Sequence, residues 1–155
     1  RKKEVRRKKG RKIKEKERNT AMATKTIIQT EEAPKAVGPY SQGVCMNAIQ
    51  FISGQLPVDP KTGKIVEGGI KAQTEQSLKN LGAVLKATQL DYPNVLKTTV
   101  LLADINDFGE MNEVYAKFFT ENPPARVCFQ VAALPMGALV EIEAVSSRGY
   151  VKVDE

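Results

Sequence analysis

Two stripes of mainly apolar residues at helical spacing, each followed by an extended apolar run, limit this chain to a fold that packs helices against a sheet. Residues three and four apart lie on one side of a helix. Both stripes therefore predict amphipathic helices with one buried face. The first stripe comprises Ile70, Thr74, Leu78, Leu81 and Leu85, and the second comprises Met111, Val114, Tyr115, Phe118 and Phe119.

Strand patterns lie before, between and after these helices. Their order predicts an α+β fold in which two helices cover one face of a mixed β-sheet. The Pro- and Gly-rich segment 57–69 is predicted to be a loop. The predicted strands are 26–30, a hairpin over 44–53 that turns near Asn47 and Ala48, 95–103, a strand that starts near Arg126, and 139–148.

The ends of the second helix carry recognisable signals. Asp107 precedes the helix and Glu110 lies in its first turn, so Asp107 is predicted to be the N-cap. Pro123 and Pro124 are predicted to follow the helix and to start the next strand.

A sheet covered by helices on one face leaves its other face open. Apolar side chains are predicted there, at Val44, Ile52, Val100 and Phe129 or their neighbours. Monomers rarely expose so large an apolar patch. We therefore expect this face to be buried against further copies of the chain, with pockets between subunits.

The first residues differ in composition from the rest. Residues 1–21 hold 12 Lys and Arg against 3 Glu, a net charge of +9, whereas residues 22–155 hold 12 basic and 15 acidic residues, a net charge of −3. The basic head has almost no apolar residues and is expected to be disordered. We interpret 1–22 as a basic leader, or as sequence from cloning or from upstream of a natural start at Met22, and 23–155 as one domain. A nuclear-localisation or targeting segment, and RNA binding through the head, are the alternatives.

Several classes of chemistry are disfavoured by composition. The chain has no histidine, which removes the commonest general base. Cys45 and Cys128 are far apart in the sequence and lack metal-ligand spacing, so we expect two reduced thiols and no structural zinc site. No metal and no cofactor are predicted, and no membrane span or secretory signal is recognisable.

Segment 123–144 carries the residues best suited to bind a small carboxylate. Arg126 begins one strand pattern, and Glu141 and Glu143 lie on the next. Arginine matches a carboxylate through two parallel hydrogen bonds. A carboxylate on a neighbouring strand can hold or activate a water molecule. Together these residues predict a pocket for a small molecule with its own carboxylate group.

Four blocks of the sequence resemble the RidA (YjgF) family over nearly all of 26–149. The resemblance implies a chorismate-mutase-like fold that forms homotrimers with pockets at the subunit interfaces. It also implies a 2-iminobutanoate/2-iminopropanoate deaminase, which hydrolyses enamine and imine products of PLP-dependent enzymes to 2-oxo acids and ammonia and so protects those enzymes. The blocks are APKAVGPYSQGV at 33–44, FISGQLPVDPKTG at 51–63, VLKTTVLLADINDFGEMNEVYAKFF at 95–119 and PARVCFQVAALPMGALVEIEA at 124–144.

The resemblance implies roles for individual residues. Arg126 matches the arginine that holds the substrate carboxylate, Glu141 the acid beside the attacking water, and Tyr40 the tyrosine of a loop over the pocket. Glu143 is interpreted as a structural or exposed carboxylate, and the thiol of Cys128 is not expected to act as a nucleophile. The further substrate-binding residues that the resemblance implies are Ser53, Gly54, Asn112 and Cys128.

Other functions remain open from the sequence. The first is an RNA-acting translation inhibitor or endoribonuclease, against which the acidic body and the lack of histidine argue. The second is a non-catalytic protein that binds small carboxylates. Burial would raise the pKa of Glu141 and a neighbouring Arg126 would lower it, and the sequence leaves open which effect is larger. The cytoplasm is the expected location, with a mitochondrial form as the alternative.

Overall fold

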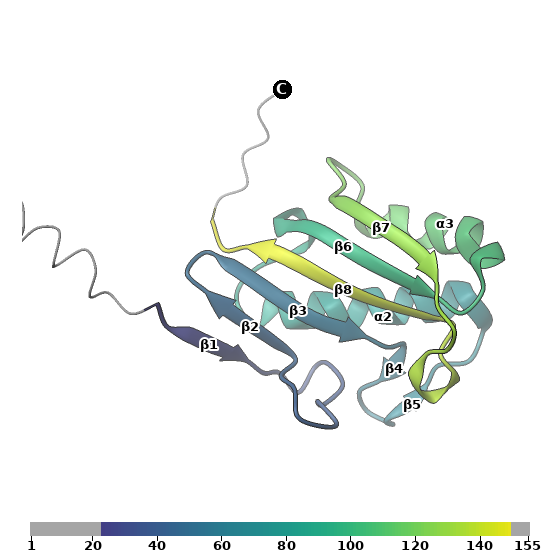
Figure 1. The fold of residues 1–155 in the computed structure, drawn as a ribbon, viewed down its shortest axis with the longest axis horizontal. Coiled ribbons are helices and arrows are strands. Elements are labelled where there is room, and N and C mark those ends of the chain that lie inside the picture. The colour runs from purple at the N-terminus through teal and green to yellow at the C-terminus, as the bar shows by residue number, and fades with distance from the viewer. Residues whose placement is uncertain (1–22, 150–155) are drawn as a thin grey trace, which may run out of the picture.

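A six-stranded mixed sheet and two α-helices form the core of the computed structural model, which describes residues 23–149 (Figure 1). The strand order is β1-β2-β3-β8-β6-β7, and only β6 and β7 run parallel. The predicted α+β class with a mixed sheet is confirmed, whereas the predicted leader 1–22 lies outside the described residues. The elements are β1 Lys25–Ile28, β2 Gly43–Met46, β3 Ile49–Gln55, α2 Gly69–Lys86, β6 Val95–Leu102, α3 Phe108–Phe118, β7 Ala125–Gln130 and β8 Val140–Ser147.

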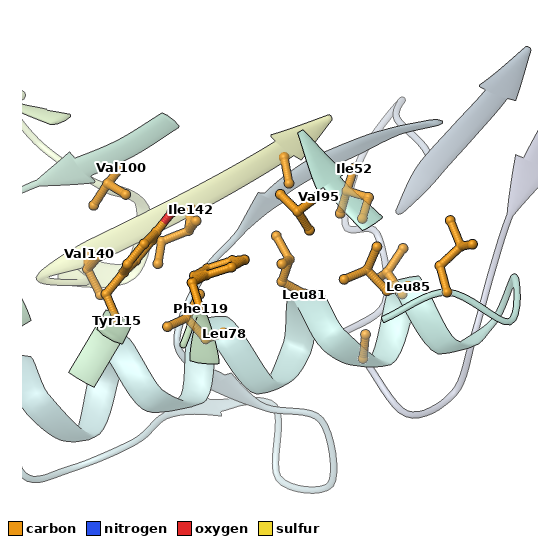
Figure 2. Close-up of a cluster of buried hydrophobic side chains, with 14 of the residues drawn as sticks. Ile52, Leu78, Leu81, Leu85, Val95, Val100, Tyr115, Phe119, Val140 and Ile142 are labelled. Carbon is orange, nitrogen blue, oxygen red and sulfur yellow. The ribbon is translucent and has the colours of Figure 1, made fainter. Parts of the chain in front are cut away.

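Both helices pack on the same face of the sheet and lie behind it in Figure 1. Leu78, Leu81 and Leu85 of α2 are fully buried and point toward the sheet, as Figure 2 shows. Tyr115 of α3 and Phe119, the residue directly after α3, join the same cluster. The two predicted helical stripes therefore form the core. Neither helix within 23–149 has the length and apolar content needed to cross a membrane.

The connection through α3 fixes the position of Arg126. Because α3 joins β6 to β7, the chain returns to the edge of the sheet and β7 pairs in parallel with β6. Arg126 lies opposite Thr98 in this ladder. Thr98 is fully buried beneath the helices. Residues directly opposite each other in a ladder project to the same face, so the side chain of Arg126 leaves β7 on the helix-covered face of the sheet.

Short elements were missed by the sequence patterns. The segment 57–69 was predicted to be a loop, yet it contains a two-stranded hairpin, β4 Val58–Asp59 and β5 Lys64–Ile65. Strands of two residues are too short to show an alternation. Three 3₁₀ turns, Tyr92–Asn94, Ile105–Asp107 and Pro135–Gly137, were also not predicted.

Asp107 precedes α3 as predicted but does not cap it with its side chain. The 3₁₀ turn Ile105–Asp107 runs directly into α3, so Asp107 already has helical backbone angles. An N-cap side chain reaches the first free N–H groups only from an extended backbone. Asp104 has that backbone and its carboxylate accepts from the N–H of Asn106 at 2.9 Å.

The open face of the sheet is mainly apolar, but two residues predicted for it point the other way. Ile52 and Val100 are buried beneath the helices. Each has an apolar neighbour in its strand, Phe51 beside Ile52 and Leu101 beside Val100, so the sequence does not reveal which of the two faces the helices. Their neighbours Phe51 and Leu101 occupy the open face instead. By register and burial, the open face carries Ile27, Val44, Met46, Ile49, Phe51, Leu101, Val127, Phe129 and Val145.

Candidate functional site

The guanidinium of Arg126 is held against α3 by one neutral acceptor and two aromatic rings. Its Nη1 donates to Oδ1 of Asn112 at 2.7 Å. Its central carbon lies 4.7 Å from the ring centre of Tyr115 and 5.5 Å from that of Phe108. Among residues 23–149 no carboxylate forms an ion pair with Arg126. The positive charge is therefore available to an anion.

Cys128 lies on the same side of β7 as Arg126, as its position two residues on predicts. It packs half-buried against the core. Burial raises the pKa of the Cys128 thiol, and the nearby charge of Arg126 only partly offsets this effect. The thiol therefore stays protonated near neutral pH, which fits the expectation that it is not a nucleophile.

Glu141 projects from β8 onto the open face, opposite Leu101 of β6. A β-bulge in β3 brings Gly54 against it, because Ser53 and Gly54 together lie opposite one residue of β8. A Cβ atom on Gly54 would lie 2.8 Å from Cδ of Glu141 and would collide with its Oε1. Only glycine leaves room for this carboxylate.

The pKa of Glu141 is raised, first by burial and second by the negative charge of Glu143. Glu143 lies two residues further along β8, on the same face, and is exposed. Arg126 does not lower the pKa of Glu141 in the chain. Burial therefore decides the question that the sequence left open.

The loop that carries Tyr40 is tied to the same part of β3. Oγ of Ser53 donates to the carbonyl of Ser41 at 2.6 Å, and the N–H of Ser53 donates to the carbonyl of Gln42 at 3.0 Å. The hydroxyl of Tyr40 accepts from the N–H of Val37 at 3.2 Å, and its ring is half exposed. The loop of Tyr40 is therefore bonded to β3 at Ser53, and the next residue, Gly54, contacts Glu141. These four residues lie in one part of the folded structure.

One chain therefore carries two groups of predicted site residues on opposite faces of the sheet. Arg126, Asn112 and Cys128 lie on the side of α3, whereas Glu141 and Ser53 lie on the open side. The sequence did contain a signal for this separation. Val140, Ile142 and Ala144 alternate with the two acids and are buried, which places the acids on the opposite face.

Phe108 and Tyr115 were not identified as site residues from the sequence. The helical spacing assigns Tyr115 to the core stripe and gives Phe108 no role. With Asn112 they are spaced four and three residues apart, which places all three on one side of α3. That spacing is the signal that could have found them.

A surface cavity of about 500 Å³ lies elsewhere, over the C-terminal half of α2 between Lys79, Lys86 and Tyr92. None of the predicted site residues lines it. It is therefore not the site that the sequence motifs indicate.

Comparisons with known proteins agree on one family. The family model described as endoribonuclease L-PSP matches residues 30–147. A human protein named 2-iminobutanoate/2-iminopropanoate deaminase is 53% identical over 123 residues, which cover 79% of this chain and 90% of the human protein.

Two solved structures are similar to the fold. A putative endoribonuclease from Thermotoga maritima has a TM-score of 0.79 and 42% identity, covering 81% of this chain and 99% of that chain. E. coli TdcF with bound serine has a TM-score of 0.77 and 43% identity, covering 80% of this chain and 99% of that chain.

Proposed function

The chain belongs to the endoribonuclease L-PSP (RidA/YjgF) family, and we propose that it is a 2-iminobutanoate/2-iminopropanoate deaminase. The observation that carries the proposal is the 53% identity to a human deaminase of that name. The family match over 30–147 spans every predicted site residue, from Tyr40 to Glu141. The resemblance inferred from the four sequence blocks is confirmed.

The ligand chemistry follows from Arg126. A guanidinium with no acidic partner among the described residues suits a ligand carboxylate, which it can hold through two parallel hydrogen bonds. The structural relative TdcF holds serine, which carries a carboxylate and a nitrogen on the same carbon atom. A 2-imino acid presents the same two groups to this chain.

The complete site is proposed to form between the protomers of a homotrimer with a chorismate-mutase-like arrangement. Two observations support this assembly. The open face is apolar and half exposed at Phe51 and Phe129, as an interface would be. The residues expected to share one pocket lie on opposite faces of the sheet, so Arg126 of one protomer meets Glu141 and Ser53 of another.

The reaction needs no histidine. Arg126 holds the substrate carboxylate and Tyr40 hydrogen-bonds the substrate or the water. Water attacks the electrophilic C=N carbon beside Glu141, whose pKa is raised by burial and by Glu143, so that it exchanges protons at a higher pH than an ordinary carboxyl. A C–O bond forms, the nitrogen gains protons, and the C–N bond breaks to give a 2-oxo acid and ammonia. Asn112, Cys128 and Gly54 are proposed to line the rest of the pocket and contact the substrate. The proposed mechanism uses no cofactor.

A coupled assay tests the proposal. A PLP-dependent threonine dehydratase generates the 2-imino acid, and formation of 2-oxobutanoate is measured with and without the protein. We expect acceleration by the wild type and at least about a 100-fold lower kcat/KM for Arg126→Ala, because the cation proposed to pair with the substrate carboxylate inside the assembled pocket is lost. Lys86→Ala, which removes a cation far from the site, should change nothing. No acceleration by the folded wild type would overturn the deaminase function.

The same samples separate the alternatives. Binding of 2-oxobutanoate without any acceleration would indicate a non-catalytic carboxylate-binding protein. Salt-dependent binding and cleavage of RNA, also without acceleration, would indicate an RNA-acting endoribonuclease. The cytoplasmic location, with a mitochondrial form as the alternative, stays a prediction.

A further inference from the structure

We propose that Phe108 and Tyr115 are positioning residues, two rings of α3 that hold the Arg126 guanidinium in the orientation that receives a ligand carboxylate. The kinetic consequence of this inference rests on the proposed deaminase function. The geometric part concerns the order of one side chain and can be measured without a substrate.

The contacts form a three-sided cradle. Asn112 accepts one hydrogen bond from Nη1, and the two ring centres lie 4.7 Å and 5.5 Å from the guanidinium carbon. Cations within about 6 Å of an aromatic ring centre are attracted by the ring's quadrupole. Because about two turns of a single helix supply all three groups, their spacing is fixed by the helix itself.

Tyr115 is the rigid wall of the cradle. It is 6% exposed, and its hydroxyl lies 2.7 Å from Oγ1 of Thr98, which is the residue opposite Arg126 in the β6–β7 ladder. Its ring also packs 4.6 Å from that of Phe119, and Figure 2 shows it pointing from α3 into the core. The ring is therefore held at both ends, and its face is fixed relative to the backbone of β7.

Phe108 is the outer wall. It is 39% exposed at the first position of α3, so its ring limits how far the arginine can swing toward solvent. Neither wall carries a negative charge, and burial raises the pKa of the Tyr115 hydroxyl, so that group stays neutral. The cradle thus orders the guanidinium without neutralising it.

An arginine ordered before binding loses less conformational freedom when the ligand arrives. Loss of one ring should therefore weaken carboxylate binding in the ground state and the transition state alike. We expect KM to rise about 3- to 30-fold and kcat to change less, which is the pattern of a lost binding contact.

The test measures the order of the Arg126 Nε–H group by ¹⁵N relaxation in the full-length, ligand-free protein. Phe108→Leu should lower that order and raise KM, and Phe108→Tyr, which keeps a ring, should retain both wild-type values. Tyr115→Phe keeps its ring and the contact with Phe119 but loses the hydroxyl contact with Thr98, so the order of Arg126 should fall less than in Phe108→Leu. Phe108 is partly exposed, so its variants are expected to fold even if changes at Tyr115 do not.

The outcomes are separable from the fate of the proposed function. Wild-type order of Arg126 in a folded Phe108→Leu protein would overturn the cradle, whether or not the protein is a deaminase. Reduced order would support it. If the order falls while KM stays at the wild-type value in an active enzyme, the rings hold Arg126 but do not serve binding, and the inference fails.

Discussion

Arg126 and Glu141 carry opposite charges in opposite kinds of surroundings. The arginine meets a neutral amide and two rings, so its charge is retained. The carboxyl of Glu141 is half-buried against Gly54 and repelled by Glu143, so it holds its proton to a higher pH than usual. A fixed cation suits a carboxylate clamp, and a carboxyl that titrates closer to neutral suits proton exchange.

Replacing Glu143 by Gln should lower the pKa of Glu141. The substitution removes the smaller of the two causes that raise it, so the pKa falls but stays above its ordinary value because burial remains. If ionised Glu141 assists the water, the acidic limb of the pH profile of kcat/KM moves to lower pH, with less than about a tenfold change in rate at neutral pH. Glu75→Gln, on the exposed side of α2, is the control. A limb that stays in place or moves to higher pH would contradict this account.

Gly54→Ala should impair activity far more than stability. The new Cβ occupies space now filled by the carboxylate of Glu141, which must turn away from its position. We expect a loss of about 100-fold in kcat, since small displacements of a catalytic group cost that much. Gly109→Ala places a methyl group where no atom lies within 4 Å, so it should leave the rate unchanged. Equal rates for both variants in the coupled assay would remove Glu141 from the mechanism.

Helical spacing was sufficient to predict α2 and α3, because each buries one continuous stripe along its length. For the strands, alternation was less informative. The runs around Ile52 and Val100 are apolar at successive positions, and a shift of one residue exchanges the two faces. The prediction that Asp107 caps α3 with its side chain was wrong. A 3₁₀ turn ahead of α3 gives Asp107 helical backbone angles, and such a short turn leaves no periodic pattern in the sequence.

Asn80 connects α2 to the hairpin that the sequence did not reveal. Its buried amide donates to the carbonyls of Leu56 and Val58, both at 2.9 Å. Asn80→Ala leaves two carbonyls without this donor, and we expect a loss of about 2–4 kcal/mol in the free energy of unfolding. Denaturant unfolding measures it, with Lys86→Ala as a control for the loss of an exposed side chain on the same helix. A loss below about 0.5 kcal/mol would mean that water replaces both bonds.

The separation of Arg126 from Glu141 has a consequence for the assembly of the whole protein. Both residues are suited to one small ligand, yet the sheet lies between them. The sequence did predict that the open face is apolar, although it misassigned two of its residues. It could not indicate how that face meets another copy, because such packing depends on the shapes of two surfaces and not on the alternation along one strand.

Phe51→Glu should separate the protomers and abolish activity together. Phe51 is 52% exposed in the chain and lies within the open face, so the variant is expected to fold. In the proposed trimer the ring is buried, which contributes about 2 kcal/mol per interface, and an unpaired carboxylate there costs more. Light scattering should therefore give the 17.0 kDa mass of one chain instead of three times that value.

The control is Lys86→Glu, which changes the charge by more than Phe51→Glu does but lies on α2, away from the open face. This variant should remain a trimer with wild-type activity. A monomeric Phe51→Glu protein that retains full deaminase activity would refute a site shared between protomers. Arg126 and Glu141 would then have to act separately. A protein that stays trimeric and active would instead place the interface on another surface. Only a variant that is both monomeric by light scattering and inactive supports a pocket in which one protomer supplies the cation and its neighbour supplies the acid.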